Sequence, residues 1–182
     1  MKRIVLIHGL VAGAIVAGLM AISVTLTING HIDLSDSQVV GYSSMVAAFL
    51  LVFFGIRSYR ETAGGGAITF GKAFKIGILI TLVASGVYVA VWQVMYWGFM
   101  PDFAEKYAAC VIEDLREDGA SAAEIAKTER QMADFQRLYR NPLFNVAVTF
   151  LEVFPVGLVV TLVSAAILRR KGAPPVADAA TA

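Results

Sequence analysis

The sequence predicts an all-α, polytopic membrane protein with four transmembrane helices and a helical hairpin outside the bilayer. Apolar residues make up 58% of the 182 residues and charged residues only 16%, compared with roughly 45–50% and about 25% in soluble domains. Four apolar stretches approach or exceed the ~20 residues that a helix needs to cross a bilayer. The segments that join them carry charges of alternating sign. Because lipid cannot satisfy free backbone groups and no strand-like alternation is present, helices are the expected spans.

The four spans are predicted over residues 4–28, 39–56, 76–99 and 143–168. The second is the shortest and carries no charge, and the fourth contains Glu152 as its single charged residue. The first stretch has an alternative interpretation as a cleaved signal peptide, which would leave three spans. Its apolar run is much longer than the about 7–15 residues of a signal sequence, and no small-x-small cleavage site follows. We therefore expect the first span to be retained.

The distribution of Lys and Arg predicts the orientation. The connection over residues 29–38 contains no Lys or Arg but has Asp33 and Asp36. Basic residues instead flank the other ends of the spans: Lys2, Arg3, Arg57, Arg60, Lys72, Lys75, Arg169, Arg170 and Lys171. By the positive-inside rule both termini are cytoplasmic, which agrees with an even number of spans. Residues 1–171 would then form a single membrane domain, and the Pro- and Ala-rich residues 172–182 a disordered tail.

Residues 101–141 predict a helical hairpin on the outer side of the membrane. Nine carboxylates and six basic side chains give this segment a formal net charge of −3. Pro101 starts a helix, Gly119 ends it, and Ser121 with Glu124 forms a capping box that starts the next. Apolar residues at helical spacing place one stripe on each helix. Together these two stripes form one apolar stripe on the inner side of the hairpin. This apolar stripe would pack on itself or lie on the bilayer interface; the alternatives are a docking surface for a partner or a lid over the bundle.

Glu152 is the candidate polar site within the membrane. It lies ten residues after Pro142, so about 15 Å along the helix axis and close to the middle of the bilayer. Ionisable residues at that depth face the bundle interior and find partners or stay protonated, and Tyr88 and Gln93 on the third span are the predicted partners. Pro155 follows and frees a backbone carbonyl nearby. A proton or ion site is one interpretation; a neutral glutamic acid that donates one interhelical hydrogen bond is the other.

The loop between the second and third spans predicts contacts with lipid rather than with nucleotide. Its three glycines at 64–66 do not belong to a phosphate-binding loop, because Ala73 occupies the hydroxyl position of that motif and no strand precedes it. Lys72, Lys75 and Arg57 are instead candidate contacts for anionic lipid headgroups. Small residues at four-residue spacing on the first, third and fourth spans predict close helix packing, in the core of the monomer or in a dimer seam.

The sequence contains no recognisable catalytic or metal-binding motif. His8 and His31 lie at opposite ends of the first span, so they cannot share a metal ion. Cys110 is the only cysteine, which excludes an internal disulfide and leaves a half-buried thiol as the expected state. We therefore predict no enzyme activity, no cofactor, no metal and no nucleic-acid partner.

Several phrases resemble a bacterial membrane family named domain of unknown function 4199. The phrases are residues 41–45 (GYSSM), 54–60 (FGIRSYR), 68–75 (ITFGKAFK), 101–103 (PDF), 106–107 (KY), 141–144 (NPLF) and 152–157 (EVFPVG). In this order they cover essentially residues 1–171. The resemblance implies a four-span protein of the bacterial cytoplasmic (inner) membrane, and it brings no activity, substrate or catalytic residue.

Two functional hypotheses follow. The first is a non-catalytic accessory or interaction component of the membrane, which acts with a protein partner or a second copy through its charged hairpin. The second is a small oligomeric transporter or a proton- or cation-conducting protein, in which Glu152 is the ion site and Pro155 the hinge. A membrane-embedded enzyme ranks third.

Overall fold

The computed structural model describes residues 1–32 and 34–170, and in this part of the chain the regular structure is helical, with one isolated β-bridge and short connecting loops. Four of the helices are long and apolar enough to cross a membrane, so the predicted fold class is confirmed. The six helices are α1 (Lys2–Ile28), α2 (Leu34–Thr62), α3 (Phe70–Gly98), α4 (Phe103–Glu117), α5 (Ala122–Tyr139) and α6 (Pro142–Leu168). Asp33, Lys171 and the tail predicted over residues 172–182 lie outside the described residues.

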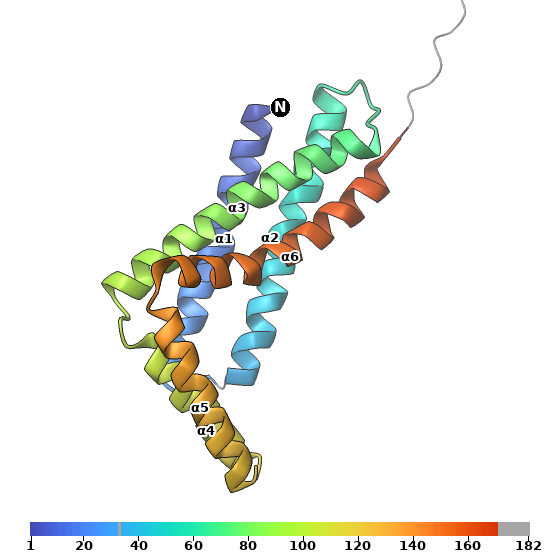
Figure 1. Ribbon diagram of the computed structural model, residues 1–182. Coiled ribbons are helices and arrows are strands. Elements are labelled where there is room, and N and C mark those ends of the chain that lie inside the picture. The colour runs from blue at the N-terminus through green and yellow to red at the C-terminus, as the bar shows by residue number, and fades with distance from the viewer. Residues whose placement is uncertain (33, 171–182) are drawn as a thin grey trace, which may run out of the picture.

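The four long helices form a bundle in which α1 and α6 are diagonal. Helix α1 packs against α2 and α3, and α6 packs against the same two helices. The start of α1, the α2–α3 loop and the end of α6 lie at one end of the bundle, which we call the loop end (Figure 1). Helices α4 and α5 form a hairpin at the opposite end, which we call the hairpin end.

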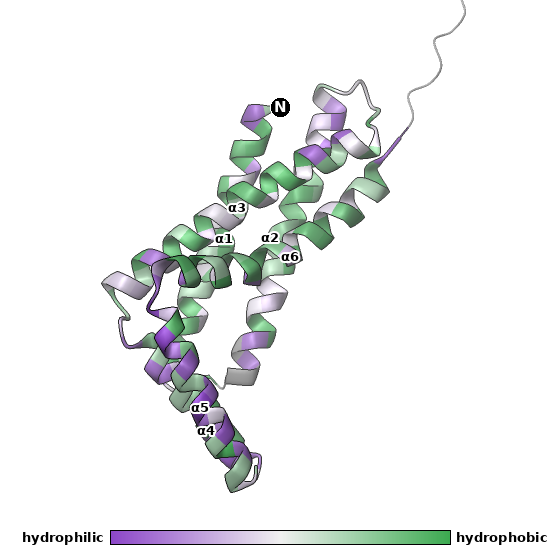
Figure 2. Ribbon diagram, viewed as in Figure 1, coloured by the Kyte–Doolittle hydropathy of each residue, from purple (hydrophilic) through white to green (hydrophobic). Residues whose placement is uncertain are grey.

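The surface of the bundle is suited to lipid. Large apolar side chains such as Leu10, Val94 and Ile167 are exposed along the spans. Figure 2 shows that the four long helices are mostly hydrophobic, whereas hydrophilic and hydrophobic residues alternate along the hairpin. In water this exposed surface would be unfavourable, whereas in a bilayer it faces hydrocarbon chains.

Small residues bring the helices into close contact, as their spacing predicts. Gly9 and Gly13 of α1 are buried against α3. Gly77 of α3 and Gly157 of α6 are buried where these two helices meet. The ridges therefore serve the core of the monomer, which is how membrane helices gain van der Waals contact without a hydrophobic driving force.

Backbone contacts tie the loop end together. Ile68 and Arg170 exchange two backbone hydrogen bonds of 3.1 and 2.9 Å, which join the α2–α3 loop to the segment after α6. The Arg60 guanidinium donates a further bond of 3.4 Å to the carbonyl of Leu168, one of the free carbonyls at the end of α6. Gly65 and Gly66 have positive φ angles of 57° and 84°, a conformation that glycine adopts without strain.

The close α1–α3 contact predicts that Gly13→Leu destabilises the protein. A Cβ at this position would lie 2.7 Å from the Cβ of Val87 and 3.0 Å from the carbonyl oxygen of Ala84, and the latter belongs to the backbone. Overpacking of this kind costs about 1–3 kcal/mol, so we expect a lower midpoint of thermal unfolding, measured by circular dichroism in lipid discs. Gly18→Leu is the matched control because nothing lies within 4 Å of its Cβ position. Equal midpoints for the two variants would contradict the packing.

Candidate functional site

A cavity of about 360 Å³ lies within the hairpin end of the bundle. All six helices contribute to its lining, the four long ones as walls and the hairpin as a roof. Its volume falls within the ~300–1,000 Å³ of small-molecule sites, and its lining of apolar and aromatic side chains with a few polar groups is typical of them.

Glu152 faces this cavity from α6. The Tyr88 hydroxyl of α3 donates a hydrogen bond of 3.1 Å to the Oε1 atom of Glu152. Glu152 is exposed in the structure, and it is one of the residues that line the cavity. The group is therefore held in one position by a neighbouring helix and remains open to a ligand.

The structure brings two of the three predicted polar residues together. Tyr88 and Glu152 form a pair, as the sequence predicts, whereas Gln93 lies in a separate group closer to the hairpin. The Gln93 amide donates to the Oδ1 atom of Asn145 at 2.7 Å, and the Trp97 indole donates to the Oε1 atom of Gln93 at 3.1 Å. Sequence reasoning missed Asn145. Its signal is a spacing of seven residues from Glu152, which is two helical turns and places both on one face of α6.

The roof of the cavity is fastened to the spans by aromatic side chains. The Trp92 indole of α3 donates a hydrogen bond of 2.8 Å to the Tyr139 hydroxyl of α5. The ring centroids of Trp92 and Phe103 are 4.7 Å apart, and those of Tyr96 and Tyr139 are 5.3 Å apart, both with edge-to-face geometry. Such pairs contribute about 0.5–1.5 kcal/mol each beyond the area that they bury.

Tyr139 is only 5% exposed, although it belongs to the polar hairpin. Burial raises the pKa of Tyr139 to about 12, so its hydroxyl is uncharged at neutral pH. It therefore both accepts the hydrogen bond from Trp92 and presents a neutral phenol to the cavity.

The apolar stripe of the hairpin is used inside the molecule. Near the spans Phe103, Tyr107 and Phe135 of the stripe line the cavity. Farther out the buried residues of α4 are Ala108 and Ile112, which lie beside the predicted row of Phe103 and Tyr107 rather than on it. The outer faces of α4 and α5 carry ion pairs such as Arg140–Glu105 (3.1 Å) and Arg116–Glu113 (3.4 Å), and Ser121 and Glu124 form the predicted capping box. Of the predicted uses of the stripe, packing on itself and covering the bundle describe what is observed.

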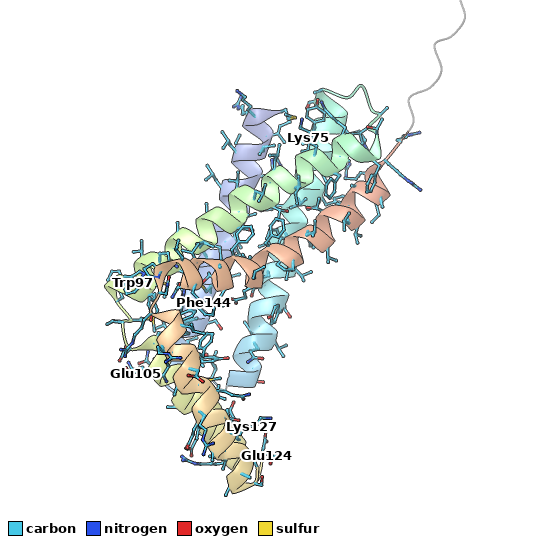
Figure 3. All side chains as sticks on the ribbon, viewed as in Figure 1. Lys75, Trp97, Glu105, Glu124, Lys127 and Phe144 are labelled. Atoms are coloured by element: carbon cyan, nitrogen blue, oxygen red, sulfur yellow. The ribbon has the colours of Figure 1, made fainter. Side chains whose placement is uncertain are left out.

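The third group of predicted site residues lies at the loop end, far from the cavity. Lys72, Lys75 and Arg57 are all exposed, and Figure 3 shows Lys75 at the opposite end of the bundle from Glu105. Arg57 forms an ion pair of 2.8 Å with Glu61, and the Lys72 ammonium lies 5.8 Å from the centroid of the Tyr59 ring. Contact of these side chains with lipid headgroups stays a prediction.

Comparison with known proteins yields one match. A family described as "Protein of unknown function (DUF4199)" matches residues 8–170. This range contains the cavity, the hairpin and the α2–α3 loop. No curated protein and no solved structure matches the chain.

The bond between Trp92 and Tyr139 predicts that Tyr139→Phe loosens the roof. The variant leaves the buried indole N–H without its partner, which costs about 1–3 kcal/mol. Cys110 belongs to α4, one of the two helices of the roof, and lines the cavity, so we expect its modification by a soluble maleimide to become at least about fivefold faster, the equivalent of 1 kcal/mol. Tyr107→Phe is the control, because it removes a hydroxyl from the same cavity without breaking a hydrogen bond between the described residues. Equal rates in both variants would refute the role of Tyr139.

Proposed function

The chain belongs to the DUF4199 family, and we propose that it is a non-catalytic interaction component of the bacterial cytoplasmic membrane whose binding site is the cavity beneath the hairpin. The observation that carries the proposal is that all six helices line one cavity of about 360 Å³. Protein interiors are close-packed, and an unfilled apolar cavity lowers stability. A ligand that occupies this space would offset that loss.

The composition of the cavity supports binding rather than catalysis. Within the described residues its lining includes one carboxyl group, from Glu152, and no histidine, lysine or arginine. General acid–base catalysis needs positioned groups that give and take protons, and here a single carboxyl group faces hydroxyls and aromatic rings. This argument supports a protein without enzyme activity.

The orientation of the site follows from the charges at the two ends of the bundle. Lys and Arg gather at the loop end, where α1 begins and α6 ends. By the positive-inside rule this end is cytoplasmic, so both termini are inside and the hairpin is outside. The cavity would then be reached from the extracytoplasmic side or from the outer leaflet.

A small transporter is the second candidate, because Glu152 lies one turn before Pro155 in α6. Figure 1 shows that α6 is bent along its length, and a proline inside a helix is a usual cause of bending. A carboxyl group that faces a cavity next to a bend is suited to alternating exposure of an ion. Four spans with one such group favour an oligomer for this function. Proton or cation flux in vesicles that is lost in Glu152→Gln would select this candidate.

The cavity predicts that Gly41→Phe displaces a bound small molecule. Gly41 of α2 lines the cavity, and nothing lies within 4 Å of its Cβ position, so a phenylalanine there fills the space without a clash with the backbone. Gly86→Phe of α3 is the matched control: its Cβ position is equally open, but Gly86 is exposed on the bundle surface. We expect mass spectrometry of extracts from lipid-disc preparations to find a compound that wild type and Gly86→Phe retain and Gly41→Phe loses by about tenfold or more. If the two variants retain the same compounds, the cavity is not a binding site.

The orientation predicts that a cysteine at position 121 is accessible from outside the cell. Ser121 is exposed at the tip of the hairpin, at the start of α5. In a Cys110→Ala background, Ser121→Cys should react with a membrane-impermeant thiol reagent in intact spheroplasts. A cysteine at Thr62, exposed at the loop end, should react only after lysis. The reverse pattern would place the hairpin in the cytoplasm.

A further inference from the structure

The cavity carries a single charged group. Glu152 is the only charged side chain among the described lining residues, and within the described chain its carboxyl group has one hydrogen-bond partner, Tyr88. A carboxylate removed from bulk water is costly unless a counter-charge or several donors face it. The part of the chain that the structure describes supplies one donor, so a cationic ligand would provide the missing partner.

Aromatic rings surround the remaining space. Seven aromatic side chains line the cavity and come from α2, α3, α4 and α5, among them Tyr42, Trp92 and Tyr107. A cation within about 6 Å of a ring face is attracted by the ring quadrupole. Proteins recognise quaternary ammonium groups such as that of choline with aromatic rings arranged in this way.

The tyrosines on the hairpin add no charge of their own. Burial, followed by the nearby Glu152 carboxylate, raises the pKa of Tyr107, and burial raises that of Tyr139 to about 12. Both hydroxyls are therefore neutral at physiological pH. Among the described lining residues, Glu152 then carries the only charge.

The lining disfavours a divalent metal ion as the occupant. Divalent metals such as Ca²⁺ need about six or more oxygen ligands. Within residues 1–32 and 34–170, no three His, Cys, Asp or Glu residues are close enough together to hold a metal ion. Most of the wall is apolar, which suits an occupant with a hydrocarbon body.

We propose that the cavity binds an organic cation, in which an ammonium group pairs with the Glu152 carboxylate and its apolar substituents pack against the aromatic rings. The inference rests on the proposed function, because it assigns a ligand class to the same cavity. Tyr88 is a positioning residue in this arrangement: its hydrogen bond holds the carboxylate toward the cavity.

Cys110 provides a reporter for the test, because it lines the cavity and is the only cysteine in the sequence. The full chain in lipid discs is treated with methanethiosulfonate reagents that carry a trimethylammonium, a hydroxyl or a sulfonate group. The rate at which each reagent modifies Cys110 is divided by the rate at which the same reagent modifies free 2-mercaptoethanol, which removes differences in intrinsic reactivity. We expect the cationic reagent to react roughly tenfold faster than the neutral one and the anionic reagent to be slowest, as a single unpaired charge in a site of low dielectric predicts.

Three variants separate the role of Glu152 from other effects. Glu152→Gln should abolish the preference for the cationic reagent, and Glu152→Asp should keep it because the charge remains. Glu113→Gln is the matched control, since Glu113 lies on the exposed side of α4, one turn from Cys110, and does not line the cavity. Loss of the preference in Glu113→Gln but not in Glu152→Gln would overturn the inference.

Protection of Cys110 by a soluble ligand completes the test. Choline and 3,3-dimethylbutan-1-ol differ only in a charged nitrogen against a carbon, and we expect choline alone to slow the neutral reagent. If both compounds protect equally, the cavity binds small molecules but the proposed cation selectivity is wrong. If neither protects, and Gly41→Phe and Gly86→Phe retain the same compounds, both this inference and the proposed function fail.

Discussion

The pairing of polar side chains between α3 and α6 is the constraint on which the rest of the structure depends. Lipid offers no hydrogen-bond partners, so polar groups inside the spans must find them within the protein. Three levels of contact do so: Thr81 with Thr161 at 2.9 Å, Tyr88 with Glu152 at 3.1 Å, and Gln93 with Asn145 at 2.7 Å. A slip of either helix along the other would break all three pairs. The register that they fix turns Glu152 toward the centre of the hairpin end.

The size of the side chains along this interface accounts for where the cavity lies. Toward the loop end, Gly77 and Gly157 allow α3 and α6 to approach closely, and Thr81 also contacts the carbonyl of Gly157. Toward the hairpin end the corresponding positions hold Tyr88 and Trp92, whose rings line open space. The hairpin covers that space with rings of its own. One interface therefore packs densely at one end and leaves room for a ligand at the other.

The fold was largely predictable from the sequence, and the site only in part. Apolar length defined the spans, and Gly119 and the capping box defined the turn of the hairpin, because these signals are local. The helix predicted to start at Pro101 begins instead at Phe103, with Asp102 as its N-cap. The Tyr88–Glu152 pair followed from the depth of the carboxyl group, since a charge there requires a neighbour. Gln93 pairs with Asn145 instead. Asn145 was missed because it is uncharged and lies within an apolar stretch of sequence. The cavity could not be foreseen, since it arises only where six helices converge.

The dependence of α3 on α6 has a consequence for biosynthesis. The ribosome delivers α3 to the membrane before the hairpin and before α6, which is the last helix of the bundle. During that interval Thr81, Tyr88 and Gln93 have none of the α6 partners that they contact in the finished protein. Individual helices insert first and associate afterwards, so the first three spans are in the membrane before α6 is present to complete the bundle. A truncated chain that ends before residue 142 would therefore lack every α6 side chain with which these three residues form hydrogen bonds in the complete bundle.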